Sequence, residues 1–230
     1  MIQAYILGVS LCGPGLDGWT ASRPILAGEQ AYAPRPVQPA VPGILAPNER
    51  RRTGAAVRLA LGLAQQASEM AGLAPGSIPS LFATSNSDGA VMHAILAPMA
   101  TPLPVSPTQF HNSVHNAAAG YWSIATGSRQ PTSCLSGHDA TAAAGLLKAA
   151  AAVHADQVPV LLCVYEVPLA EPLASRRPTA DSFGIGLVLA PHAAPGARAR
   201  LSVSYEPGTA VPEQEAPRAA VQKAHATLPS

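Results

Sequence analysis

Four side chains that could take part in nucleophilic catalysis lie close together between Ser133 and Asp139. They are Cys134, Ser136, His138 and Asp139. A thiol or hydroxyl nucleophile needs a base that accepts its proton and an acid that orients the base, so these residue types suit acyl transfer. Such groups are, however, usually brought together from distant segments, and a cysteine in a short apolar strand is more often an inert, packed thiol. The residues therefore favour a packed Cys134, with a nucleophilic Cys134 as the alternative.

His111 and His115 are four residues apart, which is the spacing of two metal ligands on one face of a helix. No glutamate lies between them and no third ligand is evident, although His138 or Asp139 could approach in space. We therefore expect no metal site, no cofactor, and hydrogen-bonding roles for both histidines.

Three consecutive arginines, Arg50, Arg51 and Arg52, precede a segment with helical periodicity. At the N-terminus of a helix their charge would oppose the helix dipole. A nearby anion would relieve this repulsion. Glu49 is the simplest candidate for that anion, and an acidic partner surface is the second.

The pattern of apolar residues predicts the elements that must position these side chains. Strands are expected at Tyr5–Leu11, Ser80–Thr84, Thr132–Leu135, Val158–Tyr165, Phe183–Ala190 and Leu201–Tyr205. Helices are expected at Thr53–Gly72, Gly89–Met99, Asn116–Thr126 and Ala140–Val153, and a proline-rich loop at Pro34–Pro47. Alternating strands and helices predict an α/β fold with a mixed, mostly parallel sheet layered with helices. We expect one domain over residues 1–205 and a tail or one late helix over residues 206–230.

Composition limits the classes of function. Hydrophobic residues make up 48% of the 230 residues and charged residues 12%, which argues against a disordered chain. The net charge of +1 gives no electrostatic basis for binding nucleic acid. No apolar run approaches the roughly 20 residues of a membrane span, and the N-terminus lacks the basic segment of a signal peptide. The three cysteines are too few and too scattered for a disulfide framework or a zinc site, so we expect a cytoplasmic protein without a membrane partner.

From Tyr5 to about Tyr205 the sequence resembles the N-terminal half of β-ketoacyl synthases. The stretch Asn116–Gly120, followed by Gly127–Pro131, is similar to the family's asparagine helix and its Gly-x-Arg-Gly-Pro motif, with Gln130 in place of the second glycine. The stretch Ser175–Leu189 resembles a shortened form of the family's Arg-Pro-Phe-Asp region. This resemblance implies the N-terminal half of a thiolase-like fold.

The alignment of this motif implies what the chain can catalyse. In the synthases the nucleophilic cysteine follows the proline at a fixed spacing, on an elbow between a strand and a helix. The same spacing from Pro131 reaches Asp139 and leaves Cys134 inside the preceding strand. A carboxylate is a much poorer nucleophile toward a thioester than a thiolate. We also expect the C-terminal half, with the family's two catalytic histidines, to be missing, so the resemblance implies a pseudoenzyme without catalytic residues.

This combination resembles a chain length factor, a non-catalytic relative that pairs with an active ketosynthase and shapes its acyl tunnel. More narrowly, the stretch from Gln109 to Asn116 is similar to truncated synthase-like proteins of aryl polyene and related type II polyketide pathways, whose chemistry resembles fatty acid biosynthesis. In homodimeric relatives the matching segment crosses the dimer interface toward the neighbour's acyl pocket. The resemblance thus implies that Gln109 and Phe110 bound the growing chain. The neighbouring His111 and Asn112 belong to the same interface segment.

Asn86 is a further candidate for the tunnel, because the loop Thr84–Ser87 is similar to a gating loop of the family. The expected partner is a full-length ketosynthase in an obligate heterodimer, since half of this fold would leave an apolar layer uncovered. An acyl carrier protein would be reached through the complex, with Arg50–Arg52 facing an acidic one. Two alternatives stay open: an active acyltransferase or condensing enzyme that uses Cys134, and a homo-oligomeric binding scaffold.

Overall fold

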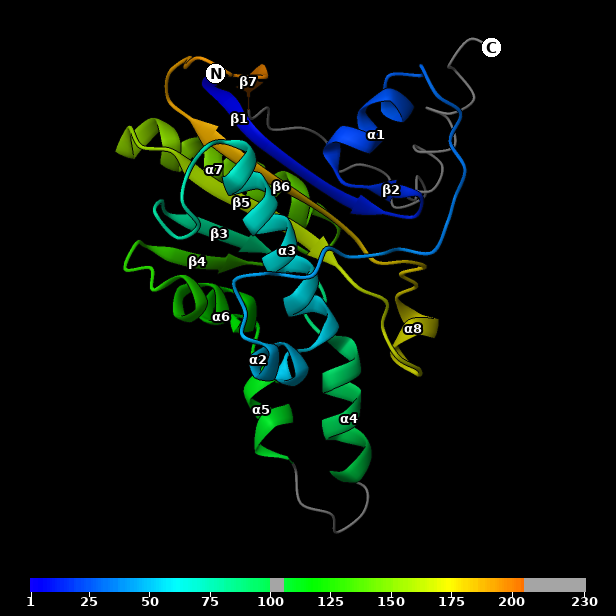
Figure 1. Cartoon of the computed structure of the whole chain (residues 1–230). Coiled ribbons are helices and arrows are strands. Elements are labelled where there is room, and N and C mark those ends of the chain that lie inside the picture. The colour runs from blue at the N-terminus through cyan, green and yellow to red at the C-terminus, as the bar shows by residue number, and fades with distance from the viewer. Residues whose placement is uncertain (100–105, 205–230) are drawn as a thin grey trace.

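The computed structural model describes residues 1–99 and 106–204, and within them seven strands form one mixed sheet (Figure 1). The strands are β1 (Ile2–Gly13), β2 (Leu16–Asp17), β3 (Ser80–Ala83), β4 (Thr132–Leu135), β5 (Val160–Glu166), β6 (Phe183–Ala190) and β7 (Ala199–Val203). Their order across the sheet is β2-β1-β6-β5-β3-β4, and β7 also pairs with β1. The predicted tail over residues 206–230 lies outside the described residues, as does Tyr205.

The sheet is mixed, as the sequence predicts, but its parallel part is smaller than expected. Strand β3 pairs in parallel with β4 and β5, whereas the other pairings among the described strands are antiparallel. A parallel return needs a long crossover connection, usually a helix. The connection from β5 to β6 contains only the short helix α8 (Leu173–Arg176), so β6 runs antiparallel to β5.

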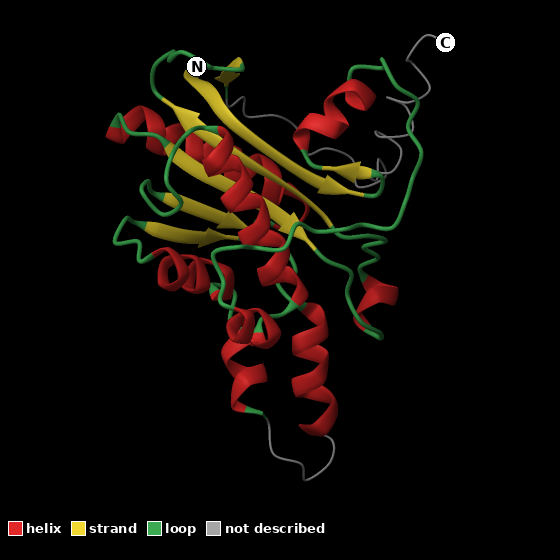
Figure 2. Cartoon of the chain, viewed as in Figure 1, coloured by secondary structure: helices red, strands yellow, loops and turns green. Residues whose placement is uncertain are grey.

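Helices cover both faces of the sheet (Figure 2). The long helices are α3 (Ala55–Met70), α4 (Gly89–Met99), α6 (Ala117–Thr126) and α7 (Thr141–Asp156). Alternate residues of β5 face opposite layers: Leu161 and Cys163 pack with α3 and α6, and Leu162 packs with α7. Strand β5 is therefore buried on both faces, as its continuous apolar run predicts.

Four short helices were not predicted: α1 (Trp19–Leu26), α2 (Pro47–Arg52), α5 (Pro107–Ser113) and α8. For α2 a proline explains why: Pro47 ends the loop predicted over Pro34–Pro47, yet it occupies the first turn of a helix, where the missing N–H costs nothing. Pro107 begins α5 in the same way. Helices α4 and α5 lie side by side and project beyond the sheet (Figure 1). Among the described residues, no helix combines the length and apolar character needed to cross a bilayer.

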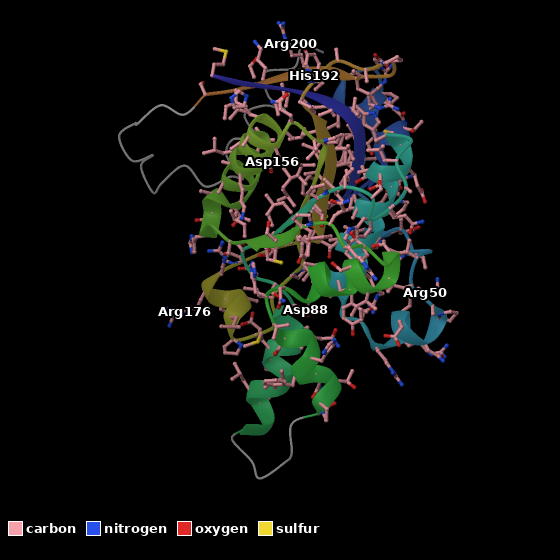
Figure 3. The ribbon with its side chains drawn as sticks, turned by 90° about the vertical axis from the view of Figure 1, so that its left-hand side faces the viewer. Arg50, Asp88, Asp156, Arg176, His192 and Arg200 are labelled. Carbon is pink, nitrogen blue, oxygen red and sulfur yellow. The ribbon has the colours of Figure 1, made fainter. Side chains whose placement is uncertain are left out.

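A single buried carboxylate joins the starts of two helices. Asp88 is 4% exposed, and its Oδ1 accepts the backbone N–H of Val91 in α4 at 3.2 Å. Its Oδ2 accepts the backbone N–H of Ala56 in α3 at 3.3 Å. The positive ends of both helix dipoles stabilise the charge. A Cβ on Gly54 would lie 2.1 Å from Oδ2, so this junction requires glycine there; Figure 3 shows Asp88 where α4 meets the rest of the domain.

Replacing Asp88 by Ala should lower the free energy of unfolding by about 2–4 kcal/mol, because it leaves N–H groups of two buried helix starts without an acceptor. D88N keeps one acceptor oxygen and should lose less. Urea denaturation followed by circular dichroism measures both changes. The matched control is D156A, at the exposed end of α7, which should be close to neutral. Equal stabilities of D88A and D156A would contradict the role of Asp88.

Candidate functional site

The parallel strands β4, β3 and β5 end at the same edge of the sheet, and the loops after them meet there. The helix that leads into β4, α6, packs on one face of the sheet, and the helix that follows β4, α7, packs on the opposite face. Open α/β sheets bind ligands at such a switch point, beyond the carboxyl ends of the strands. The residues Gly137–Asp139, between β4 and α7, form the turn at this place and are called the elbow below.

The elbow presents a carboxylate. The Asp139 side chain is 72% exposed, with Oδ1 2.8 Å from Nη2 of Arg177 and Oδ2 3.3 Å from Nδ1 of His138. The sequence did not identify Arg177, 38 residues away along the chain. The side chain of Thr141 stabilises the turn, accepting from Gly137 N at 3.0 Å and donating to His138 O at 2.6 Å.

Cys134 lies inside β4, as predicted, and not on the elbow. It is half-buried and packs against the core between the sheet and α6. Burial raises the pKa of the Cys134 thiol above its ordinary value, and burial does the same to Cys12 and Cys163. The thiolate is the reactive form of cysteine, so an inert, protonated thiol is expected at neutral pH at all three positions.

The predicted gating loop after β3 is held by a carboxylate at the end of β5. Glu166 accepts hydrogen bonds from the backbone N–H of Ser85, from Asn86 N at 3.3 Å and from Thr84 Oγ1 at 3.3 Å. The Asn86 side chain donates to Thr179 Oγ1 at 3.4 Å. Asn86 therefore lies at the carboxyl edge of the sheet, beside the connection between β5 and β6. The sequence did not identify Glu166.

The other predicted tunnel residues lie on α5, away from the elbow. Phe110 is 65% exposed, Gln109 is half-buried, and exposed His111 contacts the ring of Tyr121 edge-on at 5.5 Å. Asn112, in contrast to its neighbours Phe110 and His111, is buried. Its amide donates to the carbonyl groups of Arg52 at 2.8 Å and Thr108 at 2.9 Å, and so ties α5 to the end of α2.

The two histidines considered as metal ligands do not share a helix, because α5 ends at Ser113. His115 instead donates from Nε2 to the carbonyl of Thr84 at 3.1 Å, which links it to the loop after β3. Within residues 1–99 and 106–204, no group of three or more candidate ligands is close enough to hold a metal ion.

A groove of about 470 Å³ lies between α2, α5 and α6. It is lined by Ile44, Leu45, Ala46, Glu49, Arg52, Pro107, Thr108, His111, Tyr121, Ile124 and Ala125. Ile124 on its wall is 78% exposed, and Phe110 and Val114 are exposed on the same part of the chain. In the described sheet β4 is the last strand on this side, so its outer edge is unpaired there. Exposed apolar side chains and an open strand edge are features of an interaction surface.

The arginines precede α3, as expected, and they also form the last turn of the short helix α2, where their charge stabilises the helix end. Arg52 lies 3.8 Å from Glu49, which agrees with the predicted nearby anion. Arg51 donates to the side chain of Asn48. Figure 3 shows Arg50 on the outside of the domain.

If Cys134 is a packed thiol, iodoacetamide at pH 7 should alkylate it at least about tenfold more slowly in the folded chain than in urea. Burial raises the pKa of the Cys134 thiol. The alkylation rate of the folded chain should therefore begin to rise at a higher pH than the alkylation rate of the unfolded chain. Mass spectrometry of the Cys134 peptide gives both rates. Rapid labelling of the folded chain at pH 6 would instead indicate a nucleophilic cysteine.

Comparisons with known proteins agree with this architecture. Residues 26–230 match the sequence model of the family described as "Beta-ketoacyl synthase, N-terminal domain". No curated protein has a significantly similar sequence.

Several solved structures share the fold. A chain from the complex of the ketosynthase ApeO with its chain length factor ApeC, from Xenorhabdus doucetiae, has a TM-score of 0.70 and 21% identity, over 84% of this chain and 81% of that chain. The ishigamide ketosynthase/chain length factor has a TM-score of 0.60 and 16% identity, over 82% of this chain and 62% of that chain. A β-ketoacyl synthase from Burkholderia phymatum has a TM-score of 0.63 and 14% identity, over 83% of this chain and 59% of that chain.

The present chain thus spans less than two thirds of the second and third of these chains, and at these identities the likeness concerns the fold. The family match covers most of the sequence, including α3, the elbow and the sheet around it. This chain belongs to the family of β-ketoacyl synthase N-terminal domains.

Proposed function

We propose that this chain is a non-catalytic chain length factor, which pairs with an active ketosynthase and bounds its acyl tunnel in polyketide or aryl polyene biosynthesis. The observation that carries the proposal is the elbow: Asp139 stands there, paired with Arg177, while Cys134 lies within β4. Two of the similar structures are complexes of a ketosynthase with a chain length factor, which supports the same proposal.

The chemistry of the elbow argues against condensation by this chain. Transfer of an acyl group from a thioester needs a strong nucleophile that can form a stable acyl intermediate. The carboxylate of Asp139 is a weak nucleophile, and its contact with the Arg177 guanidinium stabilises the charge that an attack would consume. Cys134 lies in β4, before the elbow, and burial raises the pKa of its thiol, which favours the protonated, unreactive form.

The surface for the ketosynthase is the open edge of β4 together with the exposed apolar side chains of α5 and α6. An unpaired strand edge offers a row of N–H and C=O groups to a partner strand. Phe110 on α5 and Ile124 on α6 are large apolar side chains that water now contacts. Their burial in the complex would provide the hydrophobic contribution to its stability.

Within that surface, Gln109 and Phe110 are the residues proposed to face the partner's acyl tunnel. A side chain of fixed size at the end of a tunnel excludes longer acyl groups by steric overlap. The binding free energies of acyl groups that differ by one methylene then differ by about 1–3 kcal/mol. Asn86, at the carboxyl edge of the sheet, is proposed to act with the loop after β3. The arginines of α2 are proposed to contact an acidic acyl carrier protein.

Co-expression tests the central claim. The tagged chain, expressed with its candidate ketosynthase, should elute from size-exclusion chromatography as a one-to-one complex, with the mass measured by light scattering. A chain that stays monodisperse and binds no ketosynthase would contradict the proposal. A stable homo-oligomer would point to the scaffold alternative instead.

The variant I124E should weaken the complex at least about tenfold, because it places a charge in the proposed apolar contact. F110E should act in the same direction. The control is L26E, which changes another exposed apolar side chain on α1, a helix outside the proposed surface. Affinities come from biolayer interferometry with immobilised ketosynthase. If L26E weakens binding as much as I124E does, the surface is wrongly placed.

The double variant R50E/R51E should leave the complex intact and weaken its binding of acyl carrier protein. The loss should be larger at low salt, because exposed charges are screened as ionic strength rises. The control is R200E on β7, since Figure 3 shows Arg200 at the top of the domain and Arg50 well below it, at the right-hand side. Titration of the complex with carrier protein at two salt concentrations gives the affinities, and equal effects of both changes would exclude the α2 site.

A further inference from the structure

We propose that Arg177 and His138 form an anion-binding cradle at the elbow, and that Asp139 is the positioning residue that fills it. By filling it, Asp139 holds the connection between β5 and β6, residues 167–182, against the carboxyl edge of the sheet. The inference deepens the proposed function, because it gives the side chain at the nucleophile position a task of its own.

One guanidinium joins three segments that are far apart in the sequence. Arg177 belongs to the connection before β6, and its Nη2 donates to Asp139 Oδ1 at 2.8 Å, after β4. The same Nη2 donates to Ser85 Oγ at 3.2 Å, in the loop after β3. Its Nη1 contacts Nε2 of His138. The Arg177 side chain is only 27% exposed, so this arginine lies between the loops.

The contact with Arg177 indicates which ring nitrogen of His138 carries the proton in the neutral ring. Arginine can only donate, so Nε2 of His138 must accept from Nη1 of Arg177. In the neutral ring the proton is then on Nδ1, the atom that lies 3.3 Å from Asp139 Oδ2. Asp139 Oδ1 therefore accepts from Arg177, and Asp139 Oδ2 lies close to the ring of His138. A neutral side chain at position 139 would leave one or both donors without a charged acceptor.

The neighbouring arginine provides a matched comparison. Arg176 is exposed and makes no hydrogen bond or ion pair with the described residues, and Figure 3 shows it at the outside of the domain. The two arginines are adjacent and carry the same charge. The proposed cradle therefore predicts that substitution of Arg177 alters the elbow and the β5–β6 connection, whereas substitution of Arg176 does not.

A cysteine placed in the cradle would report its electrostatics. In D139C the guanidinium of Arg177 should stabilise the thiolate, as a nearby arginine does for other cysteines. The pH midpoint of iodoacetamide alkylation should then be about one pH unit lower in D139C than in D139C/R177A. D139C/R176A should titrate like D139C, because the dipole of α7 is present in all three.

The experiment uses the full chain, in complex with its ketosynthase if the two co-purify. Peptide mass spectrometry separates position 139 from Cys12, Cys134 and Cys163. Equal midpoints for D139C and D139C/R177A would overturn the proposal. Because the readout is the reactivity of one thiol in this chain, its failure would be distinct from a failure to bind ketosynthase.

Hydrogen exchange tests the positioning role separately. In D139N and R177A the amides of residues 167–182 should exchange at least about threefold faster than in the unchanged chain, because the connection is released from the edge. D139E keeps the charge and should restore slower exchange, whereas R176A should have no effect. Unchanged exchange in D139N, or equal exchange in D139N and D139E, would show that the anion does not hold the connection.

Discussion

The close approach of α3 to the sheet is the constraint on which the rest of the domain depends. A Cβ on Gly8 of β1 would lie 2.0 Å from the carbonyl oxygen of Ala67, and a Cβ on Gly186 of β6 would lie 2.9 Å from that of Leu63. Ser10 donates from Oγ to the same Leu63 carbonyl at 2.7 Å. Any other residue at these glycines would force the helix away from the strands. The glycines of β6 thus serve packing, as their place in an apolar strand indicates.

The position of α3 determines the position of the elbow through a short series of contacts. The start of α3 binds the carboxylate of Asp88, which also begins α4 and closes the loop after β3. That loop is fixed to β5 by Glu166 and to the β5–β6 connection by the contact of Ser85 with Arg177. Arg177 in turn meets Asp139. The exposed carboxylate on the elbow is therefore placed by the buried core, although ion pairs at the surface contribute little stability themselves.

Sequence patterns predict this framework well where the signal is local. Strands β3, β4 and β6 and helix α6 lie at or within one residue of their expected bounds, and the family motif places Cys134 in a strand and Asp139 after it, as the structure has them. The contacts of Asp88, Glu166 and Arg177 could not be predicted, because each joins segments distant in the chain and no spacing reveals such a pair. Helix α2 was missed for a different reason: proline marks both a loop and the first turn of a helix.

Strand β4 connects the two regions that matter for the proposed function. Its outer edge belongs, with Phe110 and Ile124, to the surface proposed for the ketosynthase, and its carboxyl end leads directly into the elbow. A partner strand that paired with β4 would fix the direction of β4, and with it the position of Asp139 relative to Arg177. The same strand pairs in register with β3, Phe82 opposite Cys134, so the fixed position would extend to the loop after β3. Under the proposed function, the sheet would carry the position of the interface to the loops at its carboxyl edge, and the chain could shape a neighbouring tunnel without performing chemistry itself.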